Sequence, residues 1–161
     1  MVNSQMSIYV DIKRCMNCRS CEIACKLEND LPVGPRYIMV IEKEVIKDGI
    51  DKCEFLPTLC MHCGDPACKK ACPTGAIYKR LEDGIVDVNQ SQCIGCRKCL
   101  WACPFGAPQF RPDGKMQKCN LCLHRLKEGE LPACAQACCA EAIKVGTVEE
   151  ISMFIREKDK L

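Results

Sequence analysis

The run Cys93-Ile-Gly-Cys96-Arg-Lys-Cys99-Leu-Trp-Ala-Cys103-Pro104 carries the strongest chemical signal in this chain. Its spacing, C-x2-C-x2-C-x3-C-P, is typical of chains that hold [4Fe–4S] clusters through cysteine thiolates. Three cysteines in a short loop can bind one cluster. The fourth, one helical turn later, binds a second cluster. The run therefore predicts a second cysteine run elsewhere in the chain, which supplies the fourth ligand of the first cluster.

Three further runs of four cysteines are present, so the four runs use sixteen of the eighteen cysteines. The two left over, Cys53 and Cys139, are expected to be structural thiols, although Cys139 could compete with Cys138 as a ligand. The three further runs are Cys15-x2-Cys18-x2-Cys21-x3-Cys25, Cys60-x2-Cys63-x4-Cys68-x3-Cys72-Pro73 and Cys119-x2-Cys122-x11-Cys134-x3-Cys138.

Exchange of the fourth cysteine between paired runs predicts four [4Fe–4S] clusters, each with four thiolate ligands. The exchange keeps paired clusters close, because one short helix connects them, and an electron can then move between them. The expected ligand sets are Cys60, Cys63, Cys68 and Cys103; Cys72, Cys93, Cys96 and Cys99; Cys15, Cys18, Cys21 and Cys138; and Cys25, Cys119, Cys122 and Cys134.

Two other uses of so many cysteines are disfavoured. Zinc sites usually take two ligands from each of two knuckles, so runs with three closely spaced cysteines disfavour zinc. A disulfide scaffold is typical of short secreted chains, whereas residues 1–11 carry no basic and apolar export signal. Reduced thiols in the cytoplasm are therefore expected, with export on a signal-bearing partner as the other possibility.

The expected clusters leave no open coordination position for a substrate, and the chain has no glycine-rich nucleotide fingerprint. We therefore expect no catalytic residues and no enzyme activity of the chain on its own. His62 could donate a hydrogen bond to cluster sulfur or face solvent, and His124 is expected on a surface helix. Trp101 is expected to pack against a cluster.

Composition points to an interior filled by inorganic groups. Aromatic residues make up only 5% of the chain, so metal bonds should supply part of the folding energy. The formal charge of +2 would become roughly −6 with four clusters bound, since metal-bound thiols lose their protons. The scattered basic residues disfavour a nucleic-acid partner. No apolar stretch approaches the ~20 residues that span a bilayer.

Between the runs, apolar alternation and turn residues predict short hairpins and helices. Asp48-Gly49 indicates a hairpin turn. Thr147 and Glu150 have the spacing of a helix capping box, and the apolar face of that last helix is expected to cover this domain. The predicted strands are 7–12, 36–46, 50–55, 76–80, 84–88, 109–111, 115–118 and 142–145, and the predicted helical segments are 22–28, 68–72, 124–129 and 147–158.

These elements predict an α+β fold of two interleaved ferredoxin-like halves, with short β-hairpins and short helices around four cubane clusters. The whole chain, 1–161, is expected to form one iron–sulfur domain. Its outer half would comprise about residues 1–52 and 115–161, and its inner half about residues 53–114.

The pattern resembles the four-cluster iron–sulfur subunits of the dimethyl sulfoxide reductase family over roughly residues 7–146. The resemblance rests on the order and spacing of the four runs. It rests also on Cys-Pro-Thr-Gly-Ala-Ile77 and Cys-Pro-Phe-Gly-Ala107, which are similar to the family sequence after its second and third runs. Some relatives that serve nitrate reductases replace one cysteine of the third run and hold a [3Fe–4S] cluster. Cys99 is retained here, which implies four cubanes.

The resemblance implies a relay that passes single electrons between a large catalytic subunit and a redox partner. The large subunit would contain a molybdenum or tungsten pterin, as in formate dehydrogenase or aldehyde oxidoreductase, and a further redox subunit or a ferredoxin could take part. A free-standing polyferredoxin and a relay subunit of a hydrogenase or carbon monoxide dehydrogenase are the alternatives. Because the chain lacks the long C-terminal extension of membrane-bound members, a soluble complex is expected.

Overall fold

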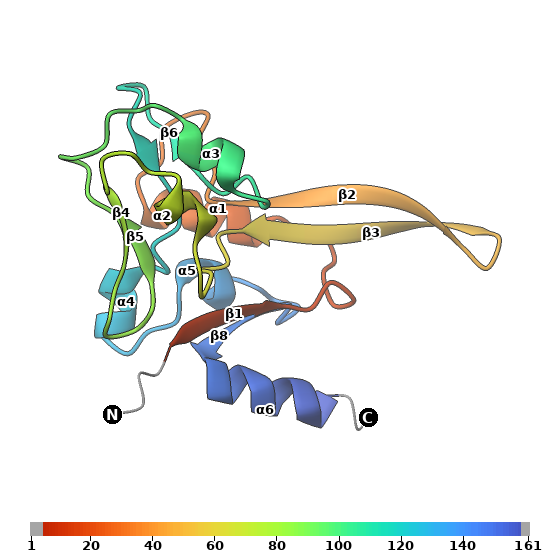
Figure 1. Cartoon of the computed structure of the whole chain (residues 1–161). Coiled ribbons are helices and arrows are strands. Elements are labelled where there is room, and N and C mark those ends of the chain that lie inside the picture. The colour runs from red at the N-terminus through yellow and green to blue at the C-terminus, as the bar shows by residue number, and fades with distance from the viewer. Residues whose placement is uncertain (1–4, 159–161) are drawn as a thin grey trace.

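The structure, a computed structural model, describes residues 5–158 and is an α+β arrangement of small helices and short antiparallel sheets (Figure 1). Most elements have five residues or fewer, so they depend on tertiary packing more than on their own stability. The strands are β1 (Met6–Val10), β2 (Ile38–Lys47), β3 (Ile50–Leu59), β4 (Ile77–Lys79), β5 (Val86–Val88), β6 (Gln109–Phe110), β7 (Met116–Gln117) and β8 (Ile143–Thr147), and the helices are α1 (Ser20–Glu28), α2 (Ala67–Lys70), α3 (Lys98–Ala102), α4 (Leu123–Lys127), α5 (Ala133–Gln136) and α6 (Val148–Lys158).

The strands pair into four separate two-stranded antiparallel sheets. Three of them join neighbouring strands, β2 with β3, β4 with β5 and β6 with β7. The fourth joins β1 to β8, with Ile8 opposite Val145, and so brings the two ends of the described chain together (Figure 1).

The interior is built largely around cysteines. Ile8, Ile38, Leu121 and Ile143 form the main buried cluster together with cysteine side chains. Among the described residues, the buried hydrophobic side chains include no Phe, Tyr or Trp, which agrees with an interior completed by other groups. The buried cysteines are Cys21, Cys25, Cys60, Cys99, Cys119, Cys122 and Cys134.

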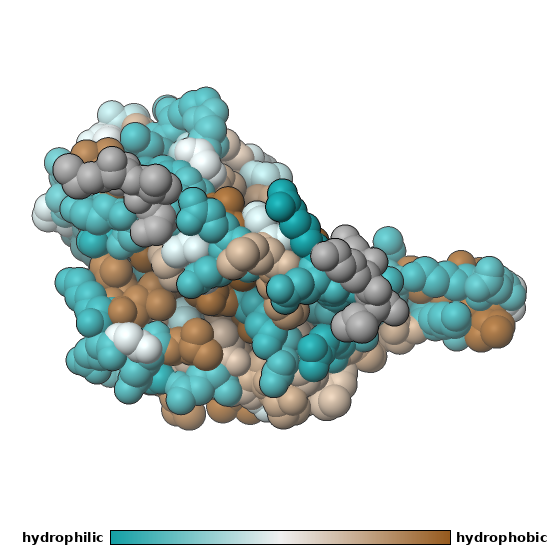
Figure 2. All heavy atoms as spheres, turned by 90° about the horizontal axis from the view of Figure 1, so that it is seen from below, coloured by the Kyte–Doolittle hydropathy of each residue, from teal (hydrophilic) through white to brown (hydrophobic). Residues whose placement is uncertain are grey.

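Strands β2 and β3 form a long arm that stands clear of the body (Figures 1 and 2). Asp48 and Gly49 connect them with positive φ angles of 55° and 73°, as the predicted two-residue hairpin turn requires. Only the base of the arm is buried, at Ile38, Val40 and Leu59, and Ile46 near its tip is 76% exposed. The arm therefore gains little stability from the body.

The second strand of the arm is longer than predicted, since it runs on from Phe55 to Leu59. The predicted strand ended at Phe55, whereas the observed strand includes Pro57, which cannot donate to a ladder. The Val40 N–H opposite Pro57 points out of the ribbon and donates to Glu22 Oε1 at 2.7 Å. No ladder hydrogen bond is needed at this pair, so the strand tolerates the proline.

Helix α6 begins with the predicted capping box. The Thr147 N–H donates to Glu150 Oε2 at 2.7 Å, and the Glu150 N–H donates to Thr147 Oγ1 at 3.2 Å. Phe154 packs edge-on against Tyr9 of β1, with ring centroids 5.8 Å apart. The helix therefore covers the β1–β8 sheet of its own chain, as expected.

Replacing Thr147 with alanine should loosen α6, because one N-terminal N–H loses its acceptor at a cost of about 1 kcal/mol. Amide hydrogen exchange in the α6 segment should then be roughly fivefold faster. Met153→Ala, a change at a side chain of the same helix that is 58% exposed, is the control. Equal exchange rates in the two variants would show that the cap does not hold the helix.

Candidate metal centres

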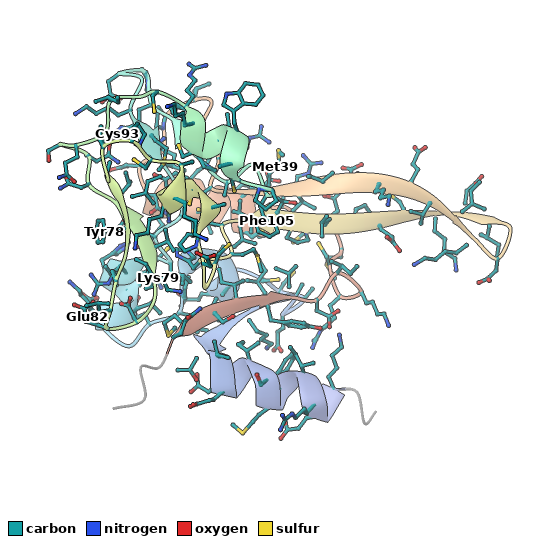
Figure 3. All side chains as sticks on the ribbon, viewed as in Figure 1. Met39, Tyr78, Lys79, Glu82, Cys93 and Phe105 are labelled. Atoms are coloured by element: carbon teal, nitrogen blue, oxygen red, sulfur yellow. The ribbon has the colours of Figure 1, made fainter. Side chains whose placement is uncertain are left out.

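One cavity of about 310 Å³ is lined by four cysteines from three segments. Cys72 follows α2, Cys93 and Cys96 lie on the loop before α3, and Cys99 lies in α3 itself. Figure 3 shows Cys93 at the end of the molecule away from α6. The rest of the wall is mostly apolar and includes Ile77, Ile94, Phe110 and Met116.

A second cavity, of about 320 Å³, is lined by Cys15, Cys18, Cys21 and Cys138. The first three cysteines surround the start of α1, and Cys138 follows α5 near the other end of the chain. The two cavities have nearly the same volume and the same kind of wall. Each presents four thiols to one largely apolar pocket, which fits a group bound by four thiolates.

A third quartet, Cys25, Cys119, Cys122 and Cys134, is buried throughout. Burial, followed by the nearby thiols of Cys119 and Cys122, raises the pKa of Cys25 to about 12. Burial, followed by the thiols of Cys25 and Cys122, raises the pKa of Cys134 to about 12. Helices α1 and α5 therefore turn their cysteines toward the loop that precedes α4.

The remaining quartet is Cys60, Cys63, Cys68 and Cys103. Burial, followed by the neighbouring thiol of Cys60, raises the pKa of both Cys63 and Cys68. The thiol of Cys103 adds to both shifts. The raised pKa values mean that these thiols are protonated near neutral pH when no metal is bound. Metal binding must therefore release protons.

The four quartets are neighbours in series. The thiol of Cys21 adds to the raised pKa of Cys134 in the buried quartet. The thiol of Cys60 raises the pKa of Cys119, after burial itself. The thiol of Cys68 likewise adds to the burial that raises the pKa of Cys99 to about 11. The same pairs share buried packing clusters, Cys21 with Cys134, Cys60 with Cys119 and Cys68 with Cys99, so each quartet lies beside the next one in this order.

The loops that carry the quartets curl through left-handed backbone positions. Arg19 and Arg97, each two residues before the third cysteine of a run, have φ angles of 58° and 62° and precede α1 and α3. At Gly95, with φ 70°, an added Cβ would lie 2.6 Å from the Gly114 carbonyl oxygen. Glycine is needed there because the β6–β7 turn closes over the loop.

Several N–H donors lie close to sulfur atoms of the predicted ligands. The Met116 N–H donates to Cys93 Sγ at 3.4 Å, and the Ala142 N–H donates to Cys138 Sγ at 3.2 Å. Asn29 Nδ2 lies 3.7 Å from Cys25 Sγ. Such bonds to sulfur stabilise the thiolate and influence the potential of a bound cluster.

Some residues do not lie where the sequence predicts them. Trp101 is 88% exposed, so its expected packing against a cluster is wrong. The two remaining cysteines are also exposed, Cys53 on the arm and Cys139 with its Sγ 3.9 Å from Cys18 Sγ, so they are not buried structural thiols. His62 is buried rather than solvent-facing. His124 is exposed, as expected, and pairs with Glu28.

All eighteen cysteines lie within residues 5–158 as free thiols. In the same range, no three His, Cys, Asp or Glu side chains converge closely enough to hold a single metal ion. No described helix is both long and apolar enough to cross a bilayer.

Family models match most of the chain. A 4Fe-4S dicluster domain matches residues 14–76, and a second 4Fe-4S dicluster domain matches residues 51–148. An anaerobic dimethyl sulfoxide reductase chain of Escherichia coli is 39% identical, over 93% of the present sequence and 77% of that protein. This chain is a member of the 4Fe-4S dicluster family, among the iron–sulfur subunits of dimethyl sulfoxide reductase-type enzymes.

Other members of the 4Fe-4S dicluster family are similarly close. The formate dehydrogenase iron-sulfur subunit of Wolinella succinogenes is 36% identical, over 96% of this chain and 88% of that subunit. A selenate reductase subunit of Mesobacillus selenatarsenatis is 35% identical, over 95% of this chain and 64% of that subunit. Family membership makes the chain an accessory iron–sulfur, electron-transfer subunit that holds 4Fe-4S clusters rather than a catalytic one.

Proposed function

We propose that the chain carries four [4Fe–4S] clusters, one on each cysteine quartet, and relays single electrons along them. The serial contact of the quartets is the observation that carries this proposal. When bound, each cluster supplies a one-electron couple. The chain's own part is to hold the thiolates, exclude water and donate N–H groups to sulfur.

The neighbouring thiols support one order along the row. It begins at Cys15, Cys18, Cys21 and Cys138, continues through the buried quartet of Cys25, Cys119, Cys122 and Cys134 and then through Cys60, Cys63, Cys68 and Cys103, and ends at Cys72, Cys93, Cys96 and Cys99.

Electrons would enter and leave at the two ends of this row. Among the sixteen proposed ligands, Cys18 and Cys96 are the exposed ones, and each is part of an end quartet. Met16 and Ile94, apolar residues beside them, are 60% and 68% exposed. Exposed apolar groups over an electron port suit contact with another protein.

The proposed partner at one port is a large catalytic subunit with a molybdenum or tungsten pterin, and at the other a further redox subunit or a ferredoxin. Relatives named as chains or subunits of dimethyl sulfoxide, formate and selenate enzymes support this assignment. Free thiols in such number suit a reducing compartment, so we place the complex in the cytoplasm.

We further propose that the chain is one domain with two interleaved ferredoxin-like halves, the outer of about residues 1–52 and 115–161 and the inner of about residues 53–114. Two contacts support this division. Strand β1 pairs with β8, and α1 packs on α5.

The test is anaerobic purification of the tagged chain from its native host. We expect about sixteen iron atoms per chain and co-purification of a large subunit that contains molybdenum or tungsten, identified by mass spectrometry and metal analysis. A chain that purifies alone with its full iron content would favour a free polyferredoxin. Far fewer iron atoms in material kept free of oxygen would overturn the proposal.

A further inference from the structure

Two buried side-chain polar atoms have no hydrogen-bond partner within residues 5–158, and both are nitrogen donors: His62 Nε2 and Gln117 Nε2. His62 Nδ1 accepts the Val86 N–H at 3.0 Å, so the neutral ring carries its proton on Nε2. The Tyr37 hydroxyl donates to Gln117 Oε1 at 3.2 Å, which fixes the amide with its NH2 free.

Both donors lie where the two central quartets meet. His62 stands between the ligands Cys60 and Cys63, and Gln117 stands two residues before Cys119. Tyr37, the partner of Gln117, packs against the buried group that contains Cys60 and Cys119. Val86 contacts both the His62 ring and Lys118 Nζ, and Lys118 Nζ also contacts the Cys119 carbonyl oxygen, so both donors belong to residues packed beside the two central quartets.

A buried N–H group without an acceptor is costly, and native proteins seldom leave one. The proposed cluster would supply acceptors to both donors, because thiolate and sulfide sulfur only accept hydrogen bonds. Side chains that face a bound cluster here must therefore offer hydrogen-bond donors rather than acceptors.

Buried positive charge lies at the same place. Lys118 is 4% exposed, and its Nζ donates to the carbonyl oxygens of Val86 and Cys119, the latter at 2.8 Å. Lys79, labelled on β4 in Figure 3, donates to the Cys63 carbonyl oxygen at 3.1 Å. The junction thus favours added negative charge.

We propose that His62 and Gln117 donate their free N–H groups to sulfur at this junction and, with Lys118, raise the reduction potential of the cluster on Cys60, Cys63, Cys68 and Cys103. The inference rests on the proposed function. One electron is added on reduction, no bond breaks, and both protons stay on their nitrogens. Hydrogen bonds to sulfur become stronger as negative charge grows, which favours the reduced state.

The experiment is a potentiometric titration of the loaded chain, followed by electron paramagnetic resonance. In His62→Leu one of the four couples should shift to lower potential by about 59 mV or more, a tenfold change in its oxidised-to-reduced ratio at fixed potential. His62→Gln, which keeps an N–H donor, should recover part of the shift. His124→Leu, a change at the exposed histidine, should leave all four couples unchanged.

A second variant, Gln117→Leu, tests the inference independently, because Gln117 lies outside the cysteine loop that contains His62. It should lower the potential of the same couple that His62→Leu lowers, while the iron content stays constant. If His62→Leu fails to load, a lowered couple in Gln117→Leu supports the inference, and four unchanged couples in Gln117→Leu overturn it. If both variants load fully and their reduction potentials are unchanged, this inference is wrong but the proposed function still stands. A wild-type chain with fewer than four couples would overturn the proposed function instead.

Discussion

Removal of iron and sulfide from the purified chain is expected to abolish its cooperative unfolding transition. Seven cysteines occupy the buried core, and two pockets lined by cysteines lie beside it. Helices of four or five residues and isolated two-stranded sheets are not stable alone in water. Metal bonds to ligands from distant segments therefore supply the folding free energy that packing does not.

The measurement is thermal unfolding by circular dichroism, before and after anaerobic chelation. The loaded chain should melt in one step, and the chelated chain should show no sigmoidal transition. Adding a reductant excludes oxidation of the exposed Cys18 and Cys139 pair as the cause, since their Sγ atoms lie only 3.9 Å apart. A chelated chain that still melts cooperatively would show that its fold is independent of the metal.

Replacing Cys99 with serine is expected to damage one cluster and to slow electron passage through the chain by at least about tenfold, because even ligand-supporting residues cost that much when changed. Cys99 is buried in α3 and lines the cavity at one end of the proposed row. If the cluster on this quartet is lost, electrons can no longer enter or leave the other three clusters at that end of the proposed row.

Two readouts test this variant. The dithionite-reduced resonance spectrum should lose one of four signals, and reduction by the partner should slow. Cys53→Ser is the matched control, because Cys53 is an exposed cysteine on the arm and lies outside every quartet. An unchanged spectrum in Cys99→Ser, or equal losses in both variants, would refute the assignment of Cys99.

Features encoded in adjacent residues could be predicted from the sequence. Asp48-Gly49 closes the arm with two positive φ angles, and Thr147 with Glu150 caps α6. The family, too, was predicted from the cysteine runs and agrees with the matched family models. In each case the deciding residues lie within a few positions of one another, so short-range geometry is sufficient.

Features that depend on distant contacts could not be predicted. Trp101 lies between two ligands in sequence, but α3 turns its ring to the surface. His62 is buried because its ring meets Val86, which comes from a strand more than twenty residues later. The strand β3 passes through Pro57 because Val40 bonds to Glu22 of α1. Neither residue spacing nor composition indicates which distant residues these side chains and backbone groups contact.

The pairing of β1 with β8 has a consequence for how this protein is made. The first strand leaves the ribosome long before its mate, and Cys138 is the last proposed ligand to emerge. On the proposed assignment, the quartet of Cys60, Cys63, Cys68 and Cys103 is complete before Cys138 has been made, so the site beside β1 is the last one to be completed.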